Sequence, residues 1–557
     1  MKNWKKIALG AASLSGAILV GLGVSTQSSA VTSARNPSLT VPAAIQTLDQ
    51  SLVTDSYSNI VIGNTESGLV RTINNKPVLD LAKSIDVSSD GLTYTITLRD
   101  GLKWSNGDAL TAKDFVYSWQ RAVDPKTASE YEYMMTYVKN ADEINSGKIT
   151  DLSQLGIKAD SDTKLTVTLK SPASFFKQVL ALSVYFPEDQ KVVEQYGKEY
   201  ATSSDKTVYS GPFMFKQGQK NGWSGSNKTY DLVKNPGYWN AKNVIAKGIN
   251  LQVVTDATQS WNLYKTGKID ATSIASPALY KAHKKDKGVV NVPLSENHYL
   301  EFNQSGKGTS SDIASKALQN INIRKAIILA TNRQGLINAV TPVNKVAYSF
   351  TPINSGLAPN GKDFSVVAKQ SIYKYDTTQA KKYWKQGLQE LGVSKLNLSL
   401  EIDSDSATGK DSASFLKKNF EADLPGLTVT LKLVPFAQRL QDSTNGNFDI
   451  VGTLWGADYQ EPSTYLNLFV AGSQQNNGKF VNADFQAAMD KAAGQDATNP
   501  TKQYDDYKAA EKALADKANV DPIEMYAGAS EQNAKLKGLV RNAVGTTLDF
   551  SKTYISK

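Results

Sequence analysis

Three stretches of the sequence decide the fold: LNLSLEI at 396–402, LTVTLKL at 427–433 and FDIVGTL at 448–454. The first two alternate apolar and polar residues, which is the period of a β-strand. A segment of helical periodicity around Leu416 separates the first strand from the second, and another near 436–440 separates the second from the third. Strand, helix, strand, helix and strand in this order predict a parallel sheet with right-handed crossovers.

The residues that follow the third strand are the candidate ligand site. Ligands of parallel sheets bind in the crevice beyond the carboxyl ends of the strands. The segment WGADYQEP at 455–462 occupies that place. It is the best ligand-site candidate that the spacing alone provides.

A helix is expected directly before this sheet. Asp376 can cap it, Gln379 follows three residues later, and Gly392 stops it. Upstream, residues 341–374 contain three prolines and two glycines, which indicate a long irregular excursion on the surface.

Residues from about 68 to 205 are predicted to form a small α+β unit. Apolar and polar residues alternate over 92–98, directly after an Asp-Gly turn, and again over 165–169. Both patterns are typical of hairpin strands with one buried face. Between them, Thr111 can cap a helix whose third position holds Asp114.

Length and composition exclude several classes of protein. A chain of 557 residues is too long for one hydrophobic core, so two or three lobes are expected. Hydrophobic residues make up 40% and charged residues 21%, which is ordinary for a globular protein. There is no cysteine, and the two histidines are His283 and His298. Disulfides, thiolate metal sites and cysteine nucleophiles are therefore excluded, and a histidine-based metal centre is disfavoured.

Residues 1–30 read as a secretory signal peptide. Three lysines precede an apolar stretch from Ile7 to Val24, and Ser28 and Ala30 offer a small-residue cleavage pattern. An uncleaved membrane anchor is the alternative. Removal of the three lysines lowers the formal charge from +9 to +6. Acidic and basic residues alternate without long blocks, so no nucleic-acid partner is expected.

No sequence motif indicates catalysis, so we expect that the protein is not an enzyme and that it needs neither a metal nor a cofactor. Residues 356–362 have the glycine and lysine spacing of a phosphate loop, but Asp363 stands where a hydroxyl residue is needed. His298 lies in a strand-like run, where a hydrogen-bonded structural role is expected. No nucleophile motif accompanies either histidine. No catalytic residue is therefore assigned.

Several motifs, in order, resemble one family. The sequence reads DGLTYT at 90–95, LRDGLKWSNGD at 98–108, LTAKDFVYSWQR at 110–121, GPF at 211–213, KNPGYW at 234–239, NIRKA at 322–326 and WGADY at 455–459. Together these motifs resemble the oligopeptide-binding proteins of bacterial ABC importers, solute-binding protein family 5. The resemblance covers essentially the whole chain after the signal segment.

The resemblance implies an α/β, three-lobed fold of the type II periplasmic-binding-protein kind, with mixed sheets and a ligand cleft between two large lobes. It implies a monomeric extracytoplasmic receptor that closes over an extended oligopeptide and delivers it to ABC permease subunits in the membrane. The expected location is the surface or wall of a Gram-positive cell. Lobe I would be discontinuous, and the expected ranges are 31–65, 207–294 and 527–557 for lobe I, 66–206 for lobe II and 295–526 for lobe III.

The resemblance also implies a peptide-binding site. In the family, the aspartate of the Trp-x-x-Asp-Tyr motif binds the peptide's α-ammonium, so the resemblance implies this role for Asp458. Trp455, Gly456, Ala457 and Tyr459 would line the same wall of the site. A helix cap before 462–468 is the alternative role of Asp458. Weaker matches are Thr54, Asp55 and Ser56 in lobe I and Tyr299, Glu301 and Asn303 on the strand entering lobe III. For these six residues a plain core or strand-face role is the alternative.

Two departures from the family pattern change the expectation. Arginines that hold a peptide carboxylate in enteric members correspond here to Ser443 and Gly452. Short peptides fixed at both ends are therefore not implied. A lipid anchor needs a cysteine, which this chain lacks. Rival functions are a relative tuned to cell-wall peptides or a peptide pheromone, and a surface adhesin that kept the fold.

Overall fold

The computed structural model describes residues 35–215, 222–225, 227–404 and 407–557. The expected signal peptide, 1–30, lies outside these residues. Within them, no helix combines the length and the apolar character needed to cross a membrane.

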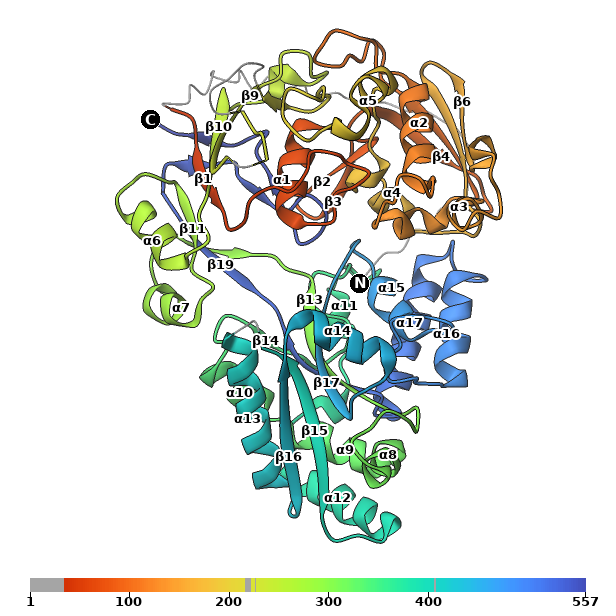
Figure 1. The fold of residues 1–557 in the computed structure, drawn as a ribbon, viewed down its shortest axis with the longest axis vertical. Helices are drawn as coiled ribbons and strands as arrows, with labels where there is room; N and C mark the ends of the chain where they lie inside the picture. Colours follow the sequence, from red (N-terminus) through yellow and green to blue (C-terminus); the bar gives the residue numbers. More distant parts are fainter. Residues whose placement is uncertain (1–34, 216–221, 226, 405–406) are drawn as a thin grey trace, which may run out of the picture. The chain divides into compact units, whose positions relative to one another are not determined.

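The central feature of residues 295–526 is a six-stranded mixed sheet (Figure 1). Its strands, in spatial order, are β14 (Lys345–Val346), β18 (Val520–Met525), β13 (Glu296–Phe302), β17 (Ile450–Gly456), β15 (Leu396–Asp403) and β16 (Leu427–Val434). Strand β15 pairs in parallel with both β16 and β17, as the sequence predicts. Strands β13, β18 and β14 add antiparallel pairs, which the periodicity did not indicate.

The predicted helices between these strands are present. They are α12 (Thr377–Leu391), α13 (Ala407–Asp423) and α14 (Phe436–Asn445). The Asp376 side chain accepts a hydrogen bond from the Gln379 backbone N–H at 2.9 Å. Gly392 ends α12 with a φ of 68°, a conformation that favours glycine. Helix α13 packs against β15 and β16.

Strand β17 has one edge that is only partly paired. Strand β13 pairs with it along its whole length, from Ile450 to Gly456. On the other edge, β15 pairs only with Ile450 and Val451. Beyond Val451, no strand of the described residues pairs with this edge, so an added strand could bind there.

Residues 66–206 contain an antiparallel sheet. Its spatial order is β4 (Ala82–Val87), β5 (Thr93–Leu98), β7 (Lys164–Thr168) and β6 (Ile157–Ser161). Both predicted hairpins are confirmed. Thr111 and Asp114 form the predicted capping box of α2 (Ala112–Val123), whose buried face carries Phe115 and Trp119.

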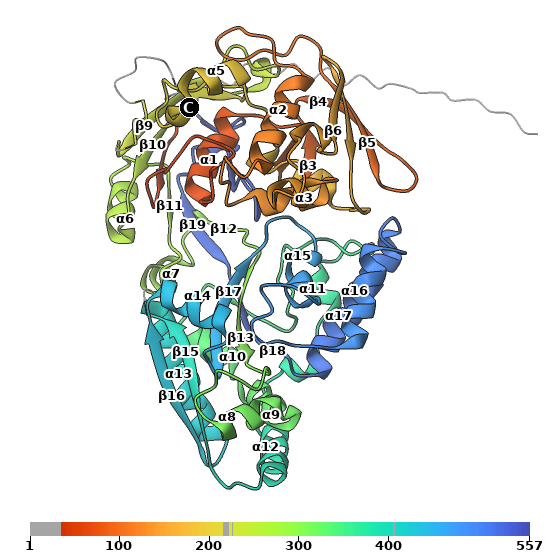
Figure 2. The ribbon, with the colours of Figure 1, turned by 45° about the vertical axis from the view of Figure 1, so that its right-hand side comes forward.

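Two further sheets lie outside residues 66–206 and 295–526. One contains β1 (Ser38–Val41), β10 (Gly248–Val253), β9 (Thr229–Lys234) and β8 (Phe213–Phe215), and the other β11 (Ala271–Ser273), β19 (Gly528–Gln532) and β12 (Val289–Val292). Strands β12 and β19 pair side by side (Figure 2). Because β12 leads into β13 and β18 leads into β19, two chain crossings lie next to each other.

The remaining helices cover these sheets and line the connections. The α-helices are α1 (Ser56–Thr65), α3 (Ala141–Asn145), α4 (Phe176–Val179), α5 (Gln190–Tyr196), α6 (Ala257–Lys265), α7 (Pro277–His283), α8 (Asp312–Gln319), α9 (Ile321–Ala330), α10 (Arg333–Ala339), α11 (Phe364–Val367), α15 (Ser463–Leu466), α16 (Ala483–Ala493) and α17 (Pro500–Asp516). Short β-pairs are β2 (Val70–Ile73) with β3 (Lys76–Leu79), β20 (Leu536–Lys537) with β23 (Tyr554–Ile555), and β21 (Val540–Arg541) with β22 (Leu548–Asp549).

The hydrophobic cores follow a coarser division than the expected lobes. One cluster of buried residues runs from Leu39 to Ala271 and adds a few residues near the C-terminus and Tyr459. Two others contain only residues between Tyr299 and Ile523. The expected lobes I and II thus share one core, and their boundary stays a prediction.

Candidate functional site

The residues that follow β17 line a cavity of about 460 Å³. Asp458 and Ala457 form one part of its wall, and residues from distant parts of the chain form the rest. The lining residues are Thr54, Ser56, Asn59, Glu130, Tyr131, Tyr133, Ala181, Leu182, Ser183, Glu296, Ala457, Asp458, Ala543, Val544, Gly545, Thr546 and Thr547. This volume lies in the range of small-molecule and peptide sites.

Asp458 presents a carboxylate to this cavity. Its Oδ1 accepts hydrogen bonds from the hydroxyls of Tyr131 at 3.1 Å and Tyr133 at 3.2 Å. Its Oδ2 has no hydrogen-bond partner among the residues that the structure describes. Burial raises the pKa of Asp458, and the two tyrosine hydroxyls oppose that rise. A cation near Oδ2 would stabilise the charged form further.

The alternative role of Asp458 as a helix cap has no support in its contacts. Helix α15 begins after Pro462, and Glu461 accepts the Ser463 backbone N–H at 2.8 Å. The Asp458 side chain contacts the tyrosines instead, and only its backbone N–H reaches Thr464 Oγ1, at 3.4 Å.

The lining of the cavity is acidic. It includes the carboxylates of Glu130, Glu296 and Asp458, and no lysine, arginine or histidine of the described residues. Burial also raises the pKa of Glu296. Such a cavity favours a positively charged group over an anion.

The segment 54–56, expected in lobe I, contributes its two hydroxyl residues. Thr54 and Ser56 line the cavity. Asp55, between them, is the N-cap of α1, and its carboxylate accepts hydrogen bonds from the backbone N–H groups of Tyr57 at 3.0 Å and Ser58 at 2.8 Å. The side chain of Asp55 is therefore occupied within the protein.

The other residues of the Trp-x-x-Asp-Tyr motif have separate places. Gly456 pairs with Glu296 across the sheet. Tyr459 is buried, stacks on Phe175 with ring centroids 4.4 Å apart, and shares a hydrogen bond with the Tyr137 hydroxyl. Trp455 lines a second cavity rather than the first.

The three candidates on β13 and directly after it are held inside the protein. Tyr299 packs against Phe350, with their rings in edge-to-face contact. The Asn303 amide donates hydrogen bonds to three backbone carbonyls, of Lys307, Gly446 and Phe448. Glu301 accepts the Gly478 backbone N–H at 2.6 Å, and burial raises its pKa to about 7. None of the three lines the cavity at Asp458.

A second cavity, of about 450 Å³, lies along the preceding part of β17. Its lining includes 452–455 of β17, His298 and Tyr299 of β13, Asp403, Tyr526, and Arg439 and Ser443 of α14. His298 Nδ1 lies 3.3 Å from Glu524 Oε1, the hydrogen-bonded structural role that the sequence predicts. A side chain at Gly452 would place its Cβ only 2.8 Å from Ile402 Cγ1.

Sequence reasoning did not find Tyr131, Tyr133, Glu296 or the 543–547 loop. These residues come from three separate parts of the chain, and none lies in a recognisable motif. The closeness of two tyrosines at 131 and 133 is the one local signal, because aromatic hydroxyls commonly line binding sites.

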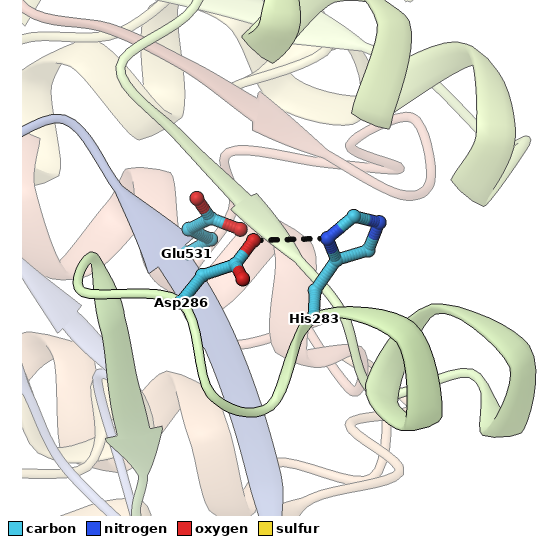
Figure 3. Close-up of side chains that lie close together, drawn as sticks. All are labelled: His283, Asp286 and Glu531. Carbon is cyan, nitrogen blue, oxygen red and sulfur yellow. Dashed lines mark hydrogen bonds and ion pairs between the residues drawn. The ribbon is translucent and has the colours of Figure 1, made fainter.

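One group of possible metal ligands lies elsewhere in the described residues. His283, Asp286 and Glu531 bring their ligand atoms within 4.8 Å of one another (Figure 3). His283 Nδ1 is already 2.9 Å from Asp286 Oδ2, and the imidazole lies 4.0 Å from the Trp261 ring. We assign no metal to this group, because His283 Nδ1 is already paired with Asp286 and Asp286 is exposed, as is common for acidic groups without a metal.

The mixed sheets, the paired crossings and the ligand-sized cavity at a strand end are those of a solute-binding protein. Over residues 76–477 the sequence matches the family described as bacterial extracellular solute-binding proteins, family 5 Middle. The chain is 48% identical to a dipeptide-binding protein of Lactococcus lactis over 558 residues, which cover 100% of both chains.

Solved structures of peptide-binding proteins are also similar to this chain. A peptide-bound OppA of Listeria monocytogenes shares 35% identity with a TM-score of 0.74, covering 94% of this chain and 99% of that one. The pheromone receptor PrgZ shares 31% identity with a TM-score of 0.75, covering 94% of this chain and 100% of that one. The protein belongs to family 5 of the bacterial extracellular solute-binding proteins, and the expected α/β fold with mixed sheets is confirmed.

Proposed function

We propose that this protein is an extracytoplasmic receptor that binds oligopeptides and delivers them to the permease of an ABC importer. The observation that carries the proposal is the Asp458 carboxylate, which is held by two tyrosines with one oxygen open to an acidic cavity. A peptide ammonium supplies one positive charge and three hydrogen-bond donors to such a group. The names of the Lactococcus and Listeria relatives support a peptide ligand.

The edge of β17 suits the peptide backbone. A receptor that accepts many side chains must hold the part that all peptides share, and adding a strand to a sheet edge does this through main-chain hydrogen bonds. The edge of β17 beyond Val451 has no partner strand among the described residues. A peptide anchored at Asp458 can extend along this edge toward Gly452.

Closure of the lobes is part of the proposal. Tyr131 and Tyr133 come from the expected lobe II, and Asp458 comes from the expected lobe III. The two adjacent crossings at β12–β13 and β18–β19 suit a hinge, since a few residues at element ends absorb such motions. Closure on a peptide should shrink the radius of gyration in solution scattering.

The remaining expectations belong to the same proposal. The receptor acts without catalysis and without a cofactor, as a monomer, outside the cytoplasm of a Gram-positive cell. Its direct partners in the membrane are the permease subunits of the ABC transporter. The likeness to PrgZ supports a peptide pheromone as a second candidate ligand, and the Asp458 site would hold the amino terminus of either ligand.

Calorimetry with alanine-based tri- to pentapeptides, free or acetylated at the amino terminus, tests the function. Asp458→Ala should weaken binding of free peptides by about 2 to 5 kcal/mol, the range for removing one partner of a buried charge pair. Acetylation should cost the parent a similar amount and the variant almost nothing.

Glu130→Gln is the matched control, because it removes a carboxylate from the same lining without touching the tyrosine contacts. It should keep most of the parent's sensitivity to acetylation. If the parent and Asp458→Ala were equally sensitive to acetylation, Asp458 would not be the amino-terminal anchor. If no peptide bound the folded parent, the receptor function would fail.

A further inference from the structure

The positive charge of the chain is concentrated in one part of it. Residues 31–65, 207–294 and 527–557, the ranges expected for lobe I, contain 18 lysines and arginines against 8 aspartates and glutamates. Their formal charge is therefore +10, whereas residues 66–206 carry −3 and residues 295–526 carry −1. Charges that serve solubility alone are expected to be mixed in sign over the whole surface. The asymmetry indicates a cationic face with an anionic partner.

Exposed lysines of these ranges lie where α6 ends and where α7 leads into β12. This lysine patch consists of Lys265, Lys268, Lys284, Lys285 and Lys287. The two helices pack together there, because the ring of Trp261 on α6 and the imidazole of His283 at the end of α7 have centroids 4.0 Å apart. Lys265 Nζ lies 5.7 Å from the centroid of the same Trp261 ring. Figure 1 shows both helices beside β11 and β19.

The protein does not neutralise the charge of the patch. None of the five lysines forms an ion pair with a described residue. Asp286 and Glu531 lie next to the patch, and Figure 3 shows both carboxylates near His283, with Asp286 Oδ2 2.9 Å from His283 Nδ1. Two carboxylates against five ammonium groups leave the patch cationic.

The patch is separate from the peptide site. None of its lysines lines the cavity at Asp458 or the second cavity along β17. A partner can therefore occupy the patch without entering the place of the peptide. For the same reason, the inference drawn from the patch does not depend on the proposed peptide-binding function.

The surface around the patch lacks the apolar side chains that hold a protein in a membrane interface. Among residues 257–288, all of them described, no large apolar side chain is exposed. Peripheral membrane helices insert such side chains between the lipid headgroups. A linear polymer with a phosphate in every repeat needs only charge, and lysines that contact it release its condensed counterions. The patch therefore fits an anionic polymer better than a membrane.

We propose that the lysine patch binds a linear phosphodiester polymer of the cell wall and thereby retains the protein at the cell surface. A contact of this kind needs no lipid anchor, for which the chain has no cysteine. Lysine presents a compact charge on a flexible stem, which suits a polymer whose phosphates have no fixed geometry. Because the contact is electrostatic and exposed, its affinity falls steeply as salt is added.

Binding of the full chain to immobilised poly(glycerol phosphate) tests the patch. The triple variant Lys284→Gln, Lys285→Gln and Lys287→Gln should bind roughly tenfold or more weakly than the parent at low salt. The slope of log affinity against log salt should become shallower by about two to three, close to one for each lysine lost. The matched control is Lys381→Gln, Lys382→Gln and Lys385→Gln, which removes the same charge from exposed positions of α12. It should bind almost as the parent does.

Vesicles of phosphatidylglycerol and phosphatidylcholine in equal parts separate a membrane partner from a polymer. Binding of the parent to the vesicles but not to the polymer would overturn the proposal and make the membrane surface the partner. Equal losses in the two triple variants would also overturn it, since net charge alone would then explain the binding. So would a parent that binds neither the polymer nor the vesicles.

Thermal unfolding of each variant checks the fold. If the triple variant of the patch did not fold, Lys265→Gln combined with Lys268→Gln would test the patch in its place. Peptide calorimetry on the same variants should give the parent's affinity, because the patch lies outside both cavities. A protein that bound no peptide but bound the polymer through the patch would refute the receptor function alone.

Discussion

Asp458, just beyond the end of β17, and Glu301, near the end of β13, are two shielded carboxylates with opposite surroundings. Asp458 faces an acidic cavity, with one oxygen held by two tyrosines and the other without a partner among the described residues. Glu301 lies inside the sheet and accepts a backbone N–H from Gly478. Burial raises the pKa of both groups. A raised pKa therefore does not distinguish a ligand-binding carboxylate from a structural one, whereas the groups that surround it do.

The largest effect should come from Glu301→Gln on stability. The folded pKa of Glu301 is about 7 against an ordinary 4.5, so folding favours the protonated form. The stability of the parent should therefore fall as pH rises from 4.5 through 7. Glutamine keeps an acceptor for Gly478 and carries no charge. The variant should be more stable than the parent by about 2 to 3 kcal/mol at pH 8, relative to their difference at pH 4.5.

Urea unfolding at pH 4.5, 6 and 8 measures this difference. Peptide affinity serves as the internal control, because Glu301 does not line the Asp458 cavity. A stability difference that is the same at all three pH values would show that Glu301 is not the titrating group. A loss of peptide affinity above tenfold would place Glu301 in the binding site and remove the contrast with Asp458.

The sequence predicted the strand that leads to Asp458 because its determinants are local. Alternation at 396–402 and 427–433, the Asp376 cap and the Gly392 stop all act within a few residues, and all are present in the structure. Periodicity did not predict the antiparallel pairing of β13 and β18. These strands are buried on both faces, so their sequences show no clear alternation.

The partners of each carboxylate could not be predicted for a different reason. Tyr131 lies 327 residues from Asp458, and Gly478 lies 177 residues from Glu301. Only the tertiary fold brings these groups together.

A smaller effect is expected on the pH dependence of peptide binding. The charged form of Asp458 binds the ammonium, and its pKa in the free protein is raised by burial. Affinity should therefore be full above that pKa and fall as pH decreases through it, by up to tenfold per pH unit, or about 1.4 kcal/mol. The fall should begin at a higher pH than for an ordinary aspartate.

Titration calorimetry of one free tetrapeptide between pH 3.5 and 7.5 measures this dependence. Asp458→Asn should bind weakly and with little change over the same range, while Glu301→Gln should follow the parent. A parent profile that is flat down to pH 4 would mean that Asp458 does not titrate in this range. The same fall in Asp458→Asn would assign it to another group, with Glu296 the next candidate in the cavity.

The smallest effect should come from the tyrosines that hold Asp458. Tyr131→Phe removes one donor to Oδ1 and leaves the Tyr133 hydroxyl in place. Because the Tyr131 hydroxyl lowers the pKa of Asp458, its loss should raise the pKa and shift the acid fall in affinity to higher pH. At pH 7 the loss of affinity should be about 1 kcal/mol, the usual net value of one hydrogen bond. Tyr57→Phe is the control, since no hydrogen bond joins it to Asp458, and it should bind as the parent does at every pH. An unchanged pH profile in Tyr131→Phe would show that the tyrosines do not set the charge of Asp458, and that its contrast with Glu301 depends on the cavity alone.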